Sequence, residues 1–217
     1  MRTLRPKTRA GFTLVEAAIA ASLLVLLMSS AVMAARSGMG AFRTTQDASD
    51  AGVRARRALD RMVFELISAD TGSLVPLFDN LDNDLGTDTL QFAKVTGLNG
   101  DDPTLGTPCR LDFVYAPGEL DDGIDNDGNG LVDDGMVVLT RDVGGDEQQV
   151  VLCRGVSERL EGEAANGADD NGNGVIDEAG FNVHVENSVL VLRLSVEQPS
   201  ENGTIVRTMS AAVSLRN

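Results

Sequence analysis

Two acidic segments with the same spacing contain the residues of this chain that are best suited to bind a metal ion. The first spans residues 122–134 and the second spans residues 166–178, at a constant offset of 44 residues. In each, oxygen-bearing side chains occupy positions 1, 3, 5 and 9 of a loop, and a glycine occupies position 6. Alternate residues can direct oxygens inward, the glycine permits a sharp turn, and calcium takes about six to eight oxygen ligands. The duplicated pattern predicts up to two calcium sites.

The expected ligands are the side chains at positions 1, 3, 5 and 9 and the backbone carbonyl at position 7. They are Asp125, Asp127, Asn129, Leu131 and Asp133 in the first loop, and Asp169, Asn171, Asn173, Val175 and Asp177 in the second. Both loops depart from the EF-hand order at position 12, where Met136 and Gly180 replace a bidentate glutamate. The missing oxygens must come from Asp134 and Glu178, or from upstream Asp122 and Asn166. Without them, the sites are expected to be weak.

The alternative is that both segments are solvated turns, since Asp, Asn and Gly are common turn residues. A single copy would fit either interpretation equally, and the duplication favours calcium. No helix pair is predicted beside the loops. They are therefore more similar to the aspartate-rich calcium loops of extracellular repeat proteins than to true EF-hands.

Residues for catalysis are missing from the sequence. His184 is the only histidine, and the alternation of residues 181–186 places it on the polar, solvent-facing side of a strand. The sequence contains no nucleophile elbow, no H-E-x-x-H motif and no Walker loop. We therefore expect a protein that is not an enzyme.

Charge and aromatic content exclude a nucleic-acid surface. The formal net charge is −15, and the first ten residues contain four basic and no acidic side chains. The rest of the chain is therefore still more acidic, which disfavours binding to phosphate backbones. Tryptophan is absent and aromatic residues make up 4% of the chain, so a stacking platform for bases is not expected.

The N-terminal residues predict a membrane anchor. A basic head (residues 1–11) is followed by the run from Gly11 to Glu16, and residues 17–35 contain no charged side chain. A helix over residues 12–35 would be about 36 Å long, and a bilayer core is about 30 Å thick. The basic head is expected to stay in the cytoplasm, with the residues after 35 outside. Glu16 is costly inside an apolar segment unless it is paired.

This N-terminus resembles the class III signal of type IV pilins and type II secretion pseudopilins. The resemblance implies that a prepilin peptidase cleaves after Gly11 and methylates the new N-terminal Phe12. It also implies that Glu16, the fifth mature residue, pairs with the N-terminal amine of a neighbouring subunit in a filament. The implied partners are other pseudopilins or pilins, the prepilin peptidase and the inner-membrane assembly platform. The alternative is an ordinary secretory signal cleaved near residues 32–34.

The remaining sequence predicts an α+β domain. Apolar residues at helical spacing predict that the first helix continues over residues 36–72. These residues are Val53, Leu59, Met62, Val63, Leu66 and Ile67. Glycines at 38, 40 and 52 weaken the helical pattern. Residues 73–217 are β-rich, with strands expected at 89–95, 110–115, 136–141, 148–153, 181–186, 189–197 and 204–215. A long helix followed by consecutive strands predicts a mostly antiparallel sheet against which the helix packs. Residues 199–203 are expected to form a hairpin turn.

The arginine-rich helix and the large strand region look similar to J-type minor pseudopilins. A minor pseudopilin in the inner membrane, with its C-terminal domain in the periplasm, is therefore the expected function. The alternatives are a minor pilin of a type IV pilus and a membrane-anchored calcium-dependent binding module. Cys109 and Cys153 lie in the exported part, where oxidation is permitted. We expect a disulfide between them, and two unpaired buried thiols are the alternative.

Overall fold

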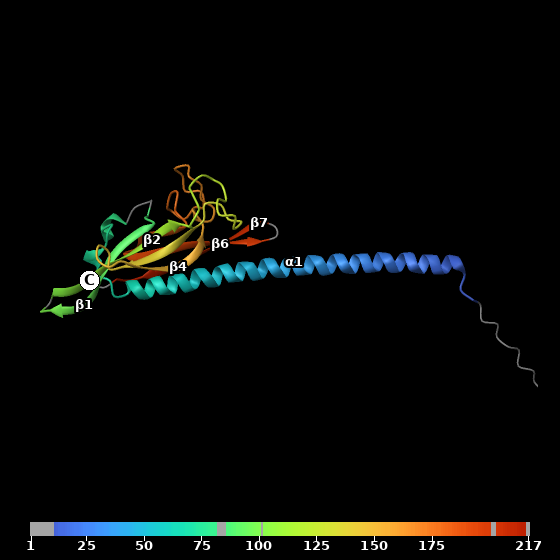
Figure 1. The fold of residues 1–217 in the computed structure, drawn as a ribbon, viewed down its shortest axis with the longest axis horizontal. Helices are drawn as coiled ribbons and strands as arrows, with labels where there is room; N and C mark the ends of the chain where they lie inside the picture. The colour runs from blue at the N-terminus through green and yellow to red at the C-terminus, as the bar shows by residue number, and fades with distance from the viewer. Residues whose placement is uncertain (1–10, 82–85, 101, 201–202, 216–217) are drawn as a thin grey trace, which may run out of the picture. The chain divides into compact units, whose positions relative to one another are not determined.

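A long N-terminal helix crosses the boundary between two compact units, residues 1–43 and 44–217. The computed structural model describes residues 11–81, 86–100, 102–200 and 203–215. The helix α1 (Leu14–Leu66) continues through the glycines at 38, 40 and 52 (Figure 1). Its N-terminal part is long and apolar enough to cross a membrane. Large apolar side chains are exposed along that part, among them Leu23, Leu24, Val25, Leu26 and Leu27, as expected for a surface that faces lipid or another helix.

The second unit contains a seven-stranded antiparallel sheet. The strands are β1 (Thr89–Asn99), β2 (Asp102–Tyr115), β3 (Gly135–Arg141), β4 (Gln148–Val156), β5 (Phe181–Glu186), β6 (Val189–Ser200) and β7 (Gly203–Val213). Their order in the sheet is β1-β2-β3-β4-β6-β5, and β7 also pairs with β6. The predicted α+β class and the antiparallel sheet are confirmed. The short 3-10 turns η1 (Thr71–Ser73) and η2 (Phe78–Asn80) precede β1.

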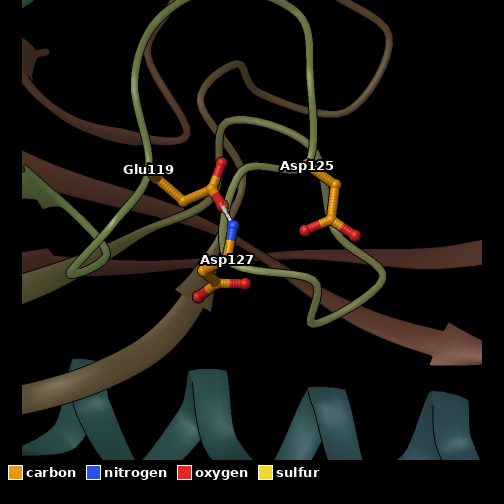
Figure 2. A group of neighbouring side chains, drawn as sticks. All are labelled: Glu119, Asp125 and Asp127. Atoms are coloured by element: carbon orange, nitrogen blue, oxygen red, sulfur yellow. Dashed lines mark hydrogen bonds between the residues drawn. The ribbon is translucent and has the colours of Figure 1, made fainter.

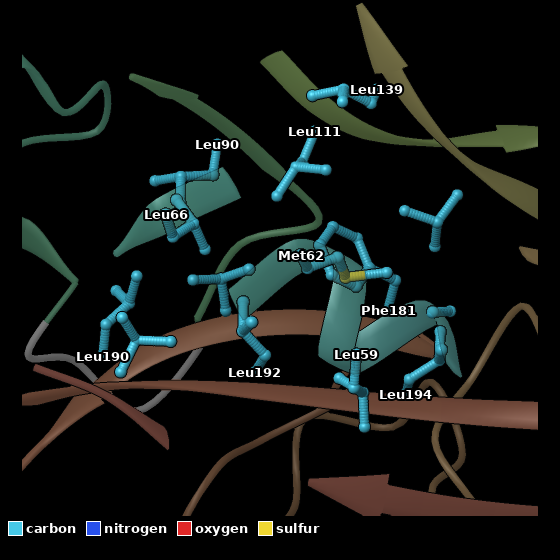
Figure 3. Packing of buried hydrophobic residues seen from close by; sticks show 14 of the residues in the cluster. Leu59, Met62, Leu66, Leu90, Leu111, Leu139, Phe181, Leu190, Leu192 and Leu194 are labelled. Carbon is cyan, nitrogen blue, oxygen red and sulfur yellow. The ribbon is translucent and has the colours of Figure 1, made fainter. Parts of the chain in front are cut away.

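The core of this unit lies between the C-terminal part of α1 and one face of the sheet (Figure 3). Fully buried leucine and phenylalanine side chains from β1, β2, β3, β5 and β6 surround Leu59, Met62 and Leu66 of α1. Small side chains precede them on the same face of the helix, at Ala51, Ala55 and Ala58. The predicted stripe is therefore confirmed at its centre and is wrong at both ends, because Val53 and Ile67 are exposed.

Several predicted boundaries differ from the structure. β1 ends at Asn99 rather than at 95, and β2 begins at Asp102 rather than at 110. The helix ends at Leu66 rather than near residue 72, since Ala69 already forms a β-bridge with Lys94. The predicted hairpin between the last two strands is confirmed, but its connection is shorter than the predicted segment 199–203. Pro199 pairs with Thr204, and Ser200 pairs with Gly203. The ladder of β6 and β7 therefore includes three of the five residues of that segment.

The predicted disulfide between Cys109 and Cys153 is wrong for this structure, in which both thiols are free and buried. Cys109 pairs with Arg141 on one side of β3, and Cys153 pairs with Val137 on the other. Arg141 and Val137 are four residues apart along β3, and β2 and β4 are two strand spacings apart across the sheet. The Cα atoms of Cys109 and Cys153 are therefore about 16 Å apart. A disulfide requires Cα atoms within about 7 Å. Burial raises the pKa of both thiols, and that of Cys153 reaches about 11.

The predicted exposure of His184 is also wrong. Residues 181–185 of β5 are buried on both faces, and His184 is 3% exposed. Its Nδ1 lies 3.2 Å from Oδ1 of Asn182, and the backbone of Thr87 pairs with Val183 along the strand. The apolar–polar alternation of residues 181–186 indicated which side chains share a face of the strand. Whether that face is exposed to solvent depends on chain segments distant in sequence. Burial, together with the charge of Arg193, lowers the pKa of His184.

Candidate metal centre

The two acidic segments are equivalent loops at the ends of strands. The first connects β2 to β3, and the second connects β4 to β5. Their backbones repeat closely, because glycines with positive φ recur in pairs 44 residues apart: Gly118 and Gly162, Gly123 and Gly167, Gly128 and Gly172, and Gly130 and Gly174. The repeat therefore begins at Gly118-Glu119 and Gly162-Glu163, four residues before the predicted start. The constant offset is visible in the sequence and could have identified these residues.

The aspartate at position 1 organises each turn. Asp125 accepts backbone hydrogen bonds from Gly128 at 2.7 Å, Asn129 at 3.1 Å and Gly130 at 2.9 Å. Asp169 accepts the equivalent three bonds at 2.6–3.1 Å from residues 172–174. These bonds, that from Gly174 above all, lower the pKa of Asp169. The loop backbone therefore holds the Asp169 carboxylate in a fixed position and favours its ionised form.

Three carboxylates meet in the first loop. Glu119, Asp125 and Asp127 each offer an oxygen, and these oxygens lie within 4.8 Å of one another. Figure 2 shows the Glu119 carboxylate directed toward Asp125, with Asp127 beside them. Oε1 of Glu119 accepts the backbone N–H groups of Asn126 at 2.9 Å and Asp127 at 2.7 Å. Clustered carboxylate oxygens are the donors that hard divalent cations prefer.

Sequence reasoning assigned Asp125 and Asp127 and missed Glu119. Glu119 precedes loop position 1 by six residues, outside the EF-hand order that guided the prediction. The position-9 residue of the first loop, Asp133, is not part of this cluster. It lies with Asp121 and Glu158 in a second acidic cluster. Asp133 accepts backbone hydrogen bonds from residues 122 and 123, and Asp177 accepts the same bonds from residues 166 and 167. These two aspartates close the base of each loop.

The residues expected to replace the position-12 glutamate already have protein partners. Asp134 accepts a hydrogen bond from Nδ2 of Asn129 at 2.9 Å, and burial raises its pKa. Glu178 is fully buried and pairs with Arg193 at 2.6 Å and with Nδ2 of Asn173.

The other predicted positions hold the loops together. The carboxylate of Asp122 accepts the backbone N–H of Ile124, and the side-chain oxygen of Asn166 accepts that of Ala168. Oδ1 of Asn129 and of Asn173 accepts the N–H of the buried residue at position 7, Leu131 and Val175 respectively.

At the N-terminus, Gly11 and Phe12 precede α1 and are exposed. Oε2 of Glu16 accepts hydrogen bonds from the N–H and the hydroxyl of Thr13, both at 2.9 Å, and the Thr13 hydroxyl accepts the N–H of Glu16. This reciprocal arrangement is a capping box. Within one chain, Glu16 is therefore paired with the first turn of its own helix.

Comparisons with protein-family models, curated proteins and solved structures find no match to this chain.

Proposed function

We propose that this chain is a minor pseudopilin, a structural subunit of a type II secretion pseudopilus that a prepilin peptidase processes. The run Gly11–Glu16 between a basic head and the charge-free residues 17–35 is the single observation that carries the proposal. That run begins a helix whose first part exposes apolar side chains and whose last part packs on a sheet. Such a chain suits a subunit anchored in the inner membrane, with its folded domain in the periplasm.

Assembly gives Glu16 a second partner. After cleavage, the free amine of Phe12 in one subunit approaches Glu16 of the next, where each charge offsets the desolvation of the other. The apolar side chains of residues 14–35 then pack against neighbouring subunits. The sequence carries no Walker loop, so the energy for assembly comes from a separate ATPase that acts through the inner-membrane platform.

Processing is tested by mass spectrometry of the mature chain. We expect an N-terminus at N-methyl-Phe12, and a Gly11 substitution should leave the precursor uncleaved. An N-terminus near Ala35 would identify a conventional signal peptide and overturn the proposal.

The pairing role is tested by incorporation into filaments. Glu16→Gln removes the charge, while its amide oxygen can still accept the N–H of Thr13, so the helix cap persists. We expect normal cleavage and loss of incorporation. Thr13→Ala is the matched control, because it weakens the cap and keeps the charge. Normal incorporation of Glu16→Gln would contradict the pairing role.

The same anchor would suit a minor pilin of a type IV pilus. The neighbouring genes would distinguish a pseudopilin from a type IV minor pilin, since secretion operons encode several pseudopilins together with a secretin.

We also propose that the two acidic loops bind calcium in the exported domain. The cluster of Glu119, Asp125 and Asp127 supports this, with its oxygens within 4.8 Å of one another. A membrane-anchored calcium-dependent binding module is therefore the second candidate function. It is favoured if calcium binds and the chain does not enter filaments.

A further inference from the structure

We propose that Glu119 and Glu163 complete the two calcium sites in place of the position-12 glutamate, and that the first site binds calcium more tightly. This inference rests on the calcium binding proposed above. It adds a ligand that precedes each loop and an order of affinity between two loops of similar sequence.

Position 12 cannot supply a ligand in either loop. A Cβ atom added at Gly180 would lie 1.7 Å from the carbonyl oxygen of Ser157, so no side chain fits there. The equivalent residue, Met136, belongs to β3, and its sulfur lies 3.0 Å from Nη1 of Arg154. Both positions serve the packing of the sheet instead.

Glu119 offers the oxygen that the loop lacks. Its side chain is directed into the cluster (Figure 2), and the residue is 6% exposed. Two backbone N–H groups hold Oε1, whereas Oε2 is buried and has no hydrogen-bond partner among the described residues. Burying a carboxylate oxygen without a partner costs free energy, and a cation between Glu119, Asp125 and Asp127 would remove that cost.

The second loop repeats part of this arrangement around the half-buried Glu163. Glu163 lies 44 residues after Glu119, and its Oε1 accepts the N–H of Asn171 at 2.9 Å. Its Oε2 is likewise buried without a partner in the described part of the chain. The same unpaired oxygen in two equivalent loops indicates a shared ligand position.

The two ligand sets differ by one charge. The first contains three carboxylates, from Glu119, Asp125 and Asp127. The second has an amide at the third place, because Asn171 is the equivalent of Asp127. The number of charged ligands tunes calcium affinity. The first loop should therefore bind calcium more tightly than the second.

Calorimetry of the full-length chain in detergent micelles, titrated with calcium chloride, tests both parts. The wild type should bind two ions with distinct affinities. Glu119→Gln should weaken the tighter event by about tenfold or more, and Glu163→Gln should do the same to the weaker event, a scale typical of groups that support metal sites. Glu147→Gln is the matched control, since it removes the same charge from the exposed turn after β3. It should leave both events unchanged.

Melting temperatures in chelator and in calcium distinguish the loss of a calcium ligand from damage to the fold. Glutamine keeps the Oε1 acceptor that holds the loop backbone, and its amide can donate to the neighbouring aspartates. Glu119→Gln should therefore melt at least as high as the wild type in chelator while losing part of the calcium-dependent rise. A variant that melts lower in chelator and keeps the full rise would show a purely structural role and overturn the proposal.

Asn171→Asp tests the order of affinity by gain of function, because it gives the second loop the three carboxylates of the first. It should tighten the weaker event by about tenfold. No change would overturn the ordering. Wild-type binding that survives both glutamine substitutions would overturn the ligand assignment and leave calcium binding intact. An absence of calcium heat in the wild type would refute the calcium proposal itself.

Discussion

Glu65 is a buried carboxylate that joins α1 to two strands of the sheet. It is 1% exposed. Oε1 contacts Arg61 and Arg141, each at 2.7 Å, and Oε2 contacts Lys94 of β1. Burial raises the pKa of Glu65, but the hydrogen bonds and charges of Lys94 and Arg141 outweigh burial and hold the pKa below its ordinary value. The ionised form is therefore the one that the fold favours.

Replacing Glu65 should be costly because it leaves three cations without their shared partner. We expect Glu65→Gln to lower the free energy of unfolding by about 3 kcal/mol, measured by urea denaturation of the full-length chain in micelles. Asp60→Asn is the matched control on the same helix, since the Asp60–Arg56 pair is 3.6 Å long and well exposed. Its loss should cost less than about 1 kcal/mol. Equal effects of the two variants would contradict the role assigned to Glu65.

His184 should make stability depend on pH in a narrow range. Burial first, and Arg193 second, lower its pKa, against the opposing charges of Glu178 and Glu186. An unfolded histidine titrates near about 6.5, so below that pH the unfolded state binds more protons than the folded state. The free energy of unfolding should fall as pH drops from about 6.5 toward the lowered pKa, and His184 should contribute no slope above that range.

Comparison with His184→Gln isolates this contribution from that of the carboxylates. Urea denaturation at pH 7.5 and pH 5.5 should show a smaller loss of stability in the variant than in the wild type. Parallel losses would contradict the assignment.

At the scale of elements, the sequence predicted what local pattern determines. All seven strands were predicted, because each combines β-branched or aromatic residues with bounding Gly, Pro or Asp. The helix was predicted from its apolar period, but its end was misplaced because Ala69 pairs with Lys94, a contact far along the chain. The burial of His184 and the separation of the two cysteines depend on strand neighbours and register, which local pattern does not reveal.

Gly180, just before β5, lies close to the backbone that follows β4. Its N–H donates to the carbonyl of Glu158 at 2.8 Å, and its carbonyl accepts the N–H of Ser195 at 2.7 Å. Gly180→Ala would press a methyl group onto the Ser157 carbonyl. We expect a loss of about 3 kcal/mol and a melting temperature lower by about 6–12 °C. Gly97→Ala is the control within β1, because its Cβ would meet no described atom within 4 Å. A harmless Gly180→Ala would contradict this close approach.

At the scale of the whole molecule, charge is divided along the chain. The first ten residues contain only basic charged side chains, whereas the chain as a whole has a net charge of −15. The sequence predicted two equivalent acidic loops, because spacing and duplication are local features. It could not predict that Asp133 and Asp177 accept the backbone N–H groups at the base of each loop, or that Glu119 lies beside Asp125 and Asp127. That division depends on how each loop folds back over the strands it connects.

If the acidic loops bind calcium as proposed, calcium should stabilise the whole folded unit of residues 44–217. In chelator, carboxylates within each loop repel one another, and an ion that binds only the folded state stabilises it by RT ln(1 + [Ca²⁺]/Kd). For dissociation constants of about 10⁻⁴–10⁻³ M, calcium near 1 mM contributes about 0.4–1.4 kcal/mol per site. For two sites this corresponds to a melting temperature higher by about 2–10 °C. Magnesium should do less, since it requires a tight octahedron and releases water reluctantly.

Melting of the full-length chain in micelles, followed by circular dichroism in calcium, magnesium or chelator, measures the effect. The double variant Asp125→Ala with Asp169→Ala should abolish the calcium-dependent rise, because it removes the first aspartate of both clusters. The variant's own melting temperature in chelator is the reference, since both aspartates also bind the loop backbone. If the wild type melts identically with and without calcium up to about 10 mM, a range that covers weak extracellular sites, the loops act as turns and do not bind calcium.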